Sequence, residues 1–379
     1  MKVGIIGGGV AGLSTALALK KANISFHLFE QASAFKDIGA GVMLSSSTKY
    51  LLHQLGVGND FEKASTLIKD FNITNHHLQT IKRIPSNEIG YGIHRARLIE
   101  VLSKPLQQED YTLNARIEKI EQNESGVTID ANNTTYFFDI VVAADGVHSV
   151  TRNKFSPHIQ PSYTGQIMWR GIATLNLPDK FKNAAHEMWG KNKRFNIIHK
   201  GGDDYFWFCI RWIKDGIFYE EENLKQFLHQ EFNDFPEYAH AVIDADNNII
   251  KTPLRHIKFN NLNNWYNNRI VFVGDCIHAC TPDIAQGACQ AIESAYTLAA
   301  CLKKYPNNFK DAFELYQFKR KPKTKFINNA SFAFSRFSHQ RKKWQYNVLF
   351  SVFKLLPNSF LQKKFNKTND IAYMNDLQL

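Results

Sequence analysis

The sequence predicts an α/β protein: a Rossmann-like nucleotide-binding domain with an inserted mixed or antiparallel β-sheet domain, followed by C-terminal helices. Three observations predict this fold class. A glycine-rich turn joins a short apolar segment to a helix-like segment within residues 2–19. Two further buried-strand patterns, at residues 140–144 and 270–273, lead into an Asp-Gly and a Gly-Asp pair. Residues 163–174 and 186–212 show the period-two alternation that is typical of long strands.

The N-terminal segment has the order strand, turn, helix. Gly7 permits a tight turn, Gly9 lets the backbone approach a pyrophosphate, and Gly12 lets the helix pack closely on the strand. The phosphates then lie at the N-terminus of a helix. Glu30 ends the next predicted strand and is placed to accept hydrogen bonds from ribose hydroxyls. The predicted nucleotide contacts of this segment are Gly7, Gly9, Val10, Ala11, Gly12 and Glu30.

The order of the segments predicts a nucleotide-binding domain that is interrupted by the inserted sheet. Its first part covers residues 1–160, and its second part covers residues 266–305. The inserted domain covers residues 161–265, with contributions from about 70–95, and its aromatic strands predict a cover over a substrate pocket. Residues 306–379 are predicted to form basic amphipathic helices.

Length and composition indicate a globular enzyme. The 379 residues are 44% hydrophobic, which is enough for a large buried core. The five cysteines are too few for a disulfide scaffold, so we expect a reducing, cytoplasmic location. Neither a signal peptide nor an uncharged apolar run of about 18 residues is apparent. No nucleic-acid-binding motif is present, and no oligomeric state is indicated.

The positive charge is concentrated at the C-terminal end. Residues 1–300 contain 30 Lys and Arg against 31 Asp and Glu, whereas residues 301–379 contain 16 against 4. Aromatic residues recur between these basic residues, which fits two interpretations. The helices could lie on an anionic membrane surface as a peripheral contact. We favour the other interpretation, in which they bury their aromatic residues against the protein itself.

Two further motifs carry a resemblance to a known family. Asp145-Gly146 is followed by Ser149 and Arg152, and Gly274-Asp275 is followed by His278, Pro282, Gln286 and Gly287. With the N-terminal glycines, this order resembles the p-hydroxybenzoate hydroxylase-like single-component FAD monooxygenases over essentially the whole chain. The motifs are most similar to those of the urate hydroxylase and zeaxanthin epoxidase branches.

The resemblance implies a cofactor, a reductant and a reaction. FAD would be bound, and NADPH or NADH would reduce it transiently. Oxygen would then form a flavin C4a-hydroperoxide, from which one oxygen atom passes to a small aromatic or unsaturated substrate. The resemblance places the following residues at the flavin: Gly41, Val42, Arg95, Asp145, Asp275, Pro282, Gly287, Ala288 and Cys289.

The motif that begins at Gly274 also has a physical explanation that does not depend on the family. Gly287, Ala288 and Cys289 begin a predicted helix, whose N-terminal dipole could stabilise the negative charge of a reduced flavin. Ala285 stands where most family members have glycine. Two alternatives stay open: the methyl group is tolerated without change, or it shifts the loop or the flavin slightly.

Polar and aromatic residues of the inserted domain are the candidates for the substrate pocket. Asp283 is a candidate proton acceptor, Arg194 a candidate substrate anchor, and Tyr205 competes with Phe206 for the tyrosine position of the urate hydroxylase branch. Two alternatives stay open, because each arginine could be a solvated strand residue and Asp283 could only cap a helix. The other predicted pocket residues are Trp169, Arg170, Trp207 and Arg211.

Alternative functions of the same fold remain open. A flavin-dependent halogenase would share it, but the Trp-x-Trp-x-Ile-Pro segment of those enzymes is missing. A non-hydroxylating flavoprotein that acts as a redox sensor or binding protein would keep FAD as well. Cys276, His278 and Cys280 do not predict a metal site, because a second ligand pair is missing.

Overall fold

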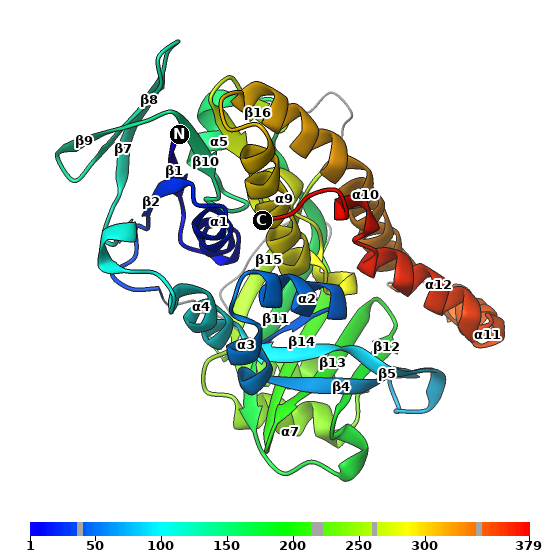
Figure 1. Cartoon of the computed structure of the whole chain (residues 1–379). Helices are drawn as coiled ribbons and strands as arrows, with labels where there is room; N and C mark the ends of the chain where they lie inside the picture. Colours follow the sequence, from blue (N-terminus) through cyan, green and yellow to red (C-terminus); the bar gives the residue numbers. More distant parts are fainter. Residues whose placement is uncertain (36–40, 214–222, 260–263, 339–342) are drawn as a thin grey trace.

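A computed structural model describes residues 1–35, 41–213, 223–259, 264–338 and 343–379 of the chain. Two large sheets organise the molecule (Figure 1). A six-stranded sheet lies with helices α1 and α9, and an eight-stranded sheet lies below them in the view. The predicted α/β fold class, with a Rossmann-like domain and a second mixed sheet, is confirmed.

The six-stranded sheet has the order β16-β17-β10-β1-β2-β6 and is parallel except for the edge pair β16 and β17. Its central strands are continuously apolar, as expected for a parallel sheet that is covered on both faces. The strands are β1 (Lys2–Ile6), β2 (Ser25–Phe29), β6 (Tyr111–Thr112), β10 (Ile140–Ala143), β16 (Tyr266–Asn267) and β17 (Ile270–Phe272).

Strands that are distant in the sequence meet in the middle of this sheet. Ile6 of β1 is in register with Ala143 of β10, which is in register with Phe272 of β17. Because parallel strands end at the same edge, the loops after these three strands lie together. The three sequence motifs are these loops, so the fold brings them into one place.

The eight-stranded sheet has the order β15-β11-β14-β13-β12-β4-β5-β3. It is antiparallel except for the parallel pair β12 and β4, so it is a mixed sheet. The predicted domain boundaries stay a prediction, and this sheet takes strands from as early as Gly41. The strands are β3 (Gly41–Leu44), β4 (Ser65–Asn75), β5 (Thr80–His94), β11 (Pro161–Thr174), β12 (Ala184–Gly190), β13 (Lys193–Gly201), β14 (Asp204–Trp212) and β15 (Ile250–Ile257).

The two faces of the eight-stranded sheet have different neighbours. One face, the outer face, packs against α6 (Leu224–Glu231) and α7 (Glu237–Ala245), and α7 lies beneath the sheet in Figure 1. The opposite face, the inner face, packs against the C-terminal helices. It also contacts Met43 of β3, the last strand of the same sheet. Side chains of successive strand residues point to opposite faces, so the register decides which residues reach which side.

Helices surround both sheets, and a small sheet projects from the nucleotide-binding side. That small sheet consists of β7 (Ile117–Gln122), β8 (Val127–Ala131) and β9 (Thr134–Phe138). The remaining helices before the C-terminal region are α1 (Val10–Lys21), α2 (Ser46–Gln54), α3 (Gly58–Ala64), α4 (Arg95–Ser103), α5 (Val150–Phe155), α8 (Asp275–His278) and α9 (Gly287–Lys304), with a 3-10 turn, η3, at Pro282–Ile284.

The C-terminal region consists of α10 (Phe309–Ser338), α11 (Lys343–Leu355) and α12 (Asn358–Asn369). After α12 the chain returns to α9, where Met374 and Leu377 are buried in the main core (Figure 1). None of the described helices combines the length and the apolar character that crossing a membrane would require.

Candidate active site

The glycine turn after β1 has the geometry that its sequence predicts. Gly7 has a φ of 103°, in the left-handed region that favours glycine. A Cβ on Gly12 would lie 1.8 Å from the carbonyl oxygen of Gly7, so the packing of α1 requires glycine there. A Cβ on Gly9 would meet no other atom of the described residues within 4 Å. The turn is therefore closed on the protein side and open where a pyrophosphate would approach.

Glu30 holds this turn in place. Its Oε2 accepts a hydrogen bond from the Gly8 N–H (2.6 Å), and its Oε1 accepts one from the Ala32 N–H (2.8 Å). The carboxylate thus fixes the end of β2 beside the glycines. Ribose hydroxyls that bind there would share Glu30 with these backbone groups.

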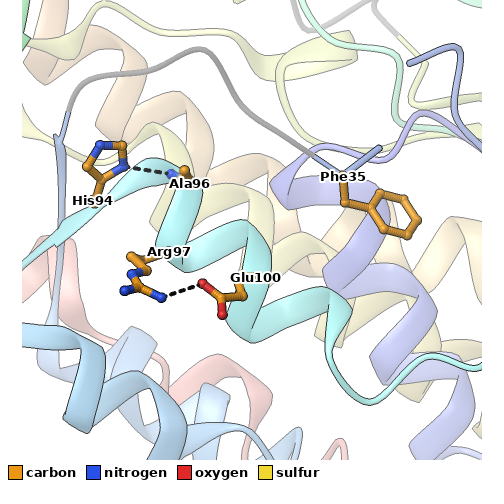
Figure 2. Close-up of a pocket in the computed structure, with 5 residues that line it drawn as sticks. All are labelled: Phe35, His94, Ala96, Arg97 and Glu100. Atoms are coloured by element: carbon orange, nitrogen blue, oxygen red, sulfur yellow. Dashed lines mark hydrogen bonds and ion pairs between the residues drawn. The ribbon is translucent and has the colours of Figure 1, made fainter. Parts of the chain in front are cut away.

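An open pocket of about 410 Å³ lies between the end of β2 and the first turn of α4. Figure 2 shows Phe35 on one side and α4 on the other, with Arg97 and Glu100 joined by an ion pair of 2.8 Å. The side chain of His94 accepts a hydrogen bond from the Ala96 N–H (3.0 Å) and caps α4. Arg97 is exposed and was not among the predicted site residues. Its position two residues after Arg95 is the sequence feature that could have pointed to it.

Asp145 and Asp275 lie at the carboxyl ends of neighbouring strands. One carboxylate oxygen of Asp145 accepts a hydrogen bond from the Thr151 N–H (3.0 Å). The side chain of Asp275 is solvent-accessible, although the residues that follow it in α8 are buried. Burial raises the pKa of its carboxyl, and the nearby Arg95 opposes this rise. Asp275 is therefore an accessible residue at the carboxyl end of β17, with Arg95 nearby.

The N-terminus of α9 faces the loop that contains Pro282. Among the described residues, no side chain caps this helix, and its first turn has no acidic residue. A Cβ on Gly287 would meet none of the described atoms within 4 Å. Cys289 is buried, and burial raises the pKa of its thiol. The free N–H groups of a helix N-terminus can therefore meet an electronegative ring edge.

Ala285 adopts the left-handed conformation, with φ 52° and ψ 36°. Ala285 stands where the resemblance expects glycine, and it holds a backbone conformation that glycine adopts more easily. A Cβ on Gly41 would lie 2.8 Å from the side chain of Phe206, so β3 approaches β14 closely. Val42 follows in β3, paired with Ile93 of β5.

The inner face of the eight-stranded sheet carries a buried charge cluster beside this loop. Arg194 on β13 lies between Glu187 on β12 and Asp283 in η3, and all three side chains are at most 3% exposed. The Arg194 guanidinium donates to Glu187 (2.8 Å) and to Oδ1 of Asp283. The indole N–H of Trp189 also donates to Glu187 (2.8 Å). We call Glu187, Arg194 and Asp283 the acidic cluster.

Electrostatics within the acidic cluster follow from this geometry. Burial acts to lower the pKa of Arg194, but the two carboxylates outweigh it and raise the pKa. Burial raises the pKa of Glu187, and Arg194 opposes that rise. Oδ2 of Asp283 is buried and has no hydrogen-bond partner among the residues that the structure describes. The partner of the carboxylate is Arg194, so a role as a simple helix cap is not what its contacts show.

Four predicted pocket residues, Trp169, Tyr205, Trp207 and Arg211, lie on the outer face, on the opposite side of the sheet from Arg194. Tyr205 and Trp207 alternate with Phe206 along β14 and pack with Trp169 against α6 and α7. Trp207 donates its indole N–H to Asp246 after α7 (2.9 Å). Arg211 forms an ion pair with Glu231 of α6. The sequence identified these strands, but the phase of the alternation requires the register.

The inner face contains other residues in their place. Phe206, the other candidate for the tyrosine position, lies on this face, and Phe208 and Arg170 are paired neighbours on the same face. Trp189 packs against Phe334 of α10 and Phe353 of α11, with ring centroids 5.8 and 5.2 Å apart. The α10 and α11 helices therefore form an aromatic wall beside the acidic cluster.

Cysteine and histidine residues after β17 are packed rather than clustered. Cys276 donates to Ser149 (3.1 Å), and the imidazole of His278 is hydrogen-bonded to Ser294 of α9 (2.9 Å). Within the described ranges, no group of three or more His, Cys, Asp or Glu side chains has the arrangement of a metal site.

Comparison with known proteins identifies the family. The family described as FAD binding domain matches residues 1–325. The chain is 30% identical over 308 residues to the aurachin C monooxygenase/isomerase of Stigmatella aurantiaca, covering 79% of each chain. It is 26% identical over 372 residues to the 2-heptyl-3-hydroxy-4(1H)-quinolone synthase of Pseudomonas aeruginosa, covering 95% of each chain.

A solved structure shows the same fold. The crystal structure of Klebsiella pneumoniae HpxO complexed with FAD and uric acid has a TM-score of 0.87 to this chain at 19% identity, covering 97% of this chain and 96% of that chain. The open glycine turn, the accessible Asp275 and the uncapped α9 suit a flavin dinucleotide. FAD is the cofactor, and NADH or NADPH is the reductant typical of the family. The chain belongs to the FAD-binding-domain family and is a p-hydroxybenzoate hydroxylase-like, FAD-dependent monooxygenase.

Proposed function

We propose that this monooxygenase hydroxylates a fused nitrogen heteroaromatic of the 4-quinolone or 4-hydroxyquinoline type. The observation that carries the proposal is Oδ2 of Asp283, a buried acceptor without a partner among the described residues, beside the loop that leads into α9. A ring N–H or O–H is the group that would satisfy it. Two relatives support this substrate class, since their names refer to aurachin C and to a heptyl-hydroxyquinolone.

Each of these inner-face residues has a separate role at the substrate ring. Arg194 holds Oδ1 of Asp283, which leaves Oδ2 as the unpartnered acceptor that we assign to the substrate. Asp283 accepts the ring N–H or O–H proton, which raises the electron density at the adjacent carbon that is attacked. Phe206 and Phe208 supply flat apolar surface, and Arg170 lies at the side of these rings. Bound FAD would supply the activated oxygen, and the aromatic wall would exclude water.

Asp283→Asn tests this role. The amide preserves size but removes the proton acceptor, so product formation should fall by about 10²-fold or more while FAD content and thermal stability are retained. The matched control is Asp246→Asn, because Asp246 is a buried acid that contacts Trp207 on the outer face. Product would be measured by mass spectrometry with a 2-alkyl-4-quinolone. Unchanged turnover in Asp283→Asn would show that another group accepts the proton.

We also propose that the protein works in the cytoplasm with a peripheral membrane contact. Val348, Val352 and Leu355 follow one another at helical spacing on α11 and are 54%, 48% and 82% exposed. Lys354 and Lys363 are exposed nearby in the sequence, within a region of strong positive charge. An exposed apolar row with flanking lysines suits the surface of an anionic bilayer. The other side of α11 belongs to the aromatic wall, so an alkylated substrate could enter from the lipid.

A further inference from the structure

We infer that Glu187 makes the inner-face subsite select an uncharged substrate and reject an aromatic carboxylate. The inference rests on the proposed substrate class and extends it, because it names the residue that sets the charge preference. Glu187 is 3% exposed and shares the Arg194 guanidinium with Asp283. Arg194, the cation with which a substrate anion would have to pair, is therefore already paired with both acids.

The charges of the acidic cluster leave no net positive charge for an anion. With both carboxylates ionised, the acidic cluster has one negative charge in excess of the guanidinium. With Glu187 protonated, Asp283 alone balances Arg194. In either state a substrate carboxylate would have to displace a buried partner, which would leave that partner as an uncompensated buried charge.

Glu187 is held in this position by more than the arginine. The Trp189 indole N–H donates to the same Oε1 atom that receives Arg194, so the carboxylate is fixed between the two donors. The guanidinium also lies 5.6 Å from the Phe334 ring of α10. Aromatic rings thus border the acidic cluster, and water has little access to screen its charges.

Asn196 supplies the neutral hydrogen-bond donor that such a subsite needs. It lies two residues after Arg194 on β13, on the same face, in register with Glu187 of β12. It is 2% exposed, and its Nδ2 has no partner among the residues described. Asn196 could donate to a substrate carbonyl while Oδ2 of Asp283 accepts an N–H. A buried donor and a buried acceptor on one surface suit a ring that presents both C=O and N–H.

Arg170 is another cation on this face, but it lies on β11, and β14 separates it from Arg194 on β13. Its register partner on β14 is Phe208, which is itself in register with Asn196. The aromatic ring of Phe208 therefore stands between Arg170 and the Asn196 row. The charge preference of the acidic cluster should depend on Glu187 rather than on Arg170.

The experiment compares matched ligand pairs that differ in one carboxylate. Binding of 4-hydroxyquinoline and 4-hydroxyquinoline-2-carboxylate, and of salicylamide and salicylate, is measured on the FAD-loaded enzyme by the change in flavin absorbance. The wild type should bind the uncharged member of each pair at least about tenfold more tightly. Glu187→Gln should reduce this preference about tenfold, and Glu187→Asp should keep most of it.

Glu231→Gln is the matched control, because Glu231 also pairs with an arginine but lies on the outer face. It should leave the preference unchanged. The inference is overturned if the wild type shows no preference for the uncharged ligand, or if folded, FAD-loaded Glu187→Gln keeps the wild-type ratio. A preference that appears only in the salicylamide pair would support the role of Glu187 and contradict the quinolone proposal.

Discussion

Two residues of the loops around α8 adopt left-handed backbone conformations, and they differ in how well they suit them. Gly274 has a φ of 71°, and a Cβ there would lie 2.6 Å from the methyl carbon of Ala11. Ala285 has a φ of 52° and carries the methyl group that glycine would lack. A left-handed alanine costs about 1 kcal/mol relative to a right-handed one. The enzyme therefore keeps a strained residue directly before its flavin-facing helix.

Ala285→Gly should raise the free energy of unfolding by about 0.5–1 kcal/mol, because glycine adopts this conformation without the Cβ penalty. Urea denaturation of the FAD-loaded protein would measure the change. The control is Ala333→Gly at an exposed position in α10, which should lower stability by about 1 kcal/mol. A loss of stability in Ala285→Gly would contradict the strain at this residue.

The sequence pattern predicts that the motifs assigned to the cofactor lie together, but it does not determine which face of the second sheet each strand residue occupies. Asp145 and Asp275 follow apolar strands, and parallel strands end at one edge, so their proximity follows from the sequence pattern. Tyr205 and Phe206 are adjacent in one strand and point to opposite faces. The choice between them depends on which face α6 and α7 cover. Glu187 was missed for the same reason, because its pairing with Arg194 appears only in the register of β12 and β13.

At the scale of elements, α9 links the cofactor cleft to the C-terminal region through buried polar contacts. Glu293 of α9 forms buried ion pairs with Arg320 and Lys323 of α10, both at 2.8 Å. Arg320 also donates to the side chain of Gln290, one turn before Glu293 (2.6 Å). Removing one partner of a buried ion pair leaves an uncompensated charge, so these contacts fix α10 against α9. The position of the aromatic wall depends on them.

His278 connects α8 to the same helix and should make stability depend on pH. Burial, with Arg320 nearby, lowers the pKa of His278 to about 3. Between pH 6.5 and about 3 the unfolded chain binds a proton there that the folded protein does not. Its contribution to stability is therefore present above pH 6.5 and is lost as the pH falls, by up to about 1.4 kcal/mol per pH unit.

His278→Asn should make the free energy of unfolding fall less steeply between pH 6.5 and 4, as measured by urea denaturation at each pH. The control is His158→Asn, since His158 is exposed and its replacement should leave the wild-type slope unchanged. Equal slopes in His278→Asn and the wild type would mean that His278 is not the titrating group.

At the scale of the whole molecule, the chain forms two large sheets: a largely parallel one that carries the FAD motifs, and a mixed one that we propose faces the substrate. The sequence predicted this division, because the apolar runs of a covered parallel sheet differ from the alternation of the second sheet. It offered two interpretations of the C-terminal helices, burial of their aromatic residues against the protein and contact with a membrane surface, and the second stays a proposal. Phe350 and Phe353 pack against Trp189, as the favoured interpretation expected, whereas Val352 and Leu355 are exposed. The packing of α11 on the sheet determines which side of the helix is buried, and the sequence pattern alone does not.

The exposed side of α11 predicts binding to anionic vesicles. The FAD-loaded protein should sediment with phosphatidylglycerol vesicles, bind phosphatidylcholine vesicles more weakly, and dissociate as salt is raised. Glu at both Val352 and Leu355 should weaken binding at least about tenfold without loss of FAD. Val150→Glu is the control, because Val150 is also an exposed valine but lies on α5. Vesicle binding that survives the double change would place the contact elsewhere. If the wild type instead forms a dimer that the double change dissociates, the row is a subunit interface.

The most direct test of the account follows oxygen into the product. Purified protein should contain about one FAD per chain, and Asp275→Ala should weaken its retention. NAD(P)H oxidation should be slow alone and accelerate with a 2-alkyl-4-quinolone. With ¹⁸O₂, mass spectrometry should find one labelled oxygen atom in the product. Rapid NAD(P)H oxidation without a labelled product from any aromatic compound would contradict the account, and a product that gains chlorine or bromine would identify a halogenase.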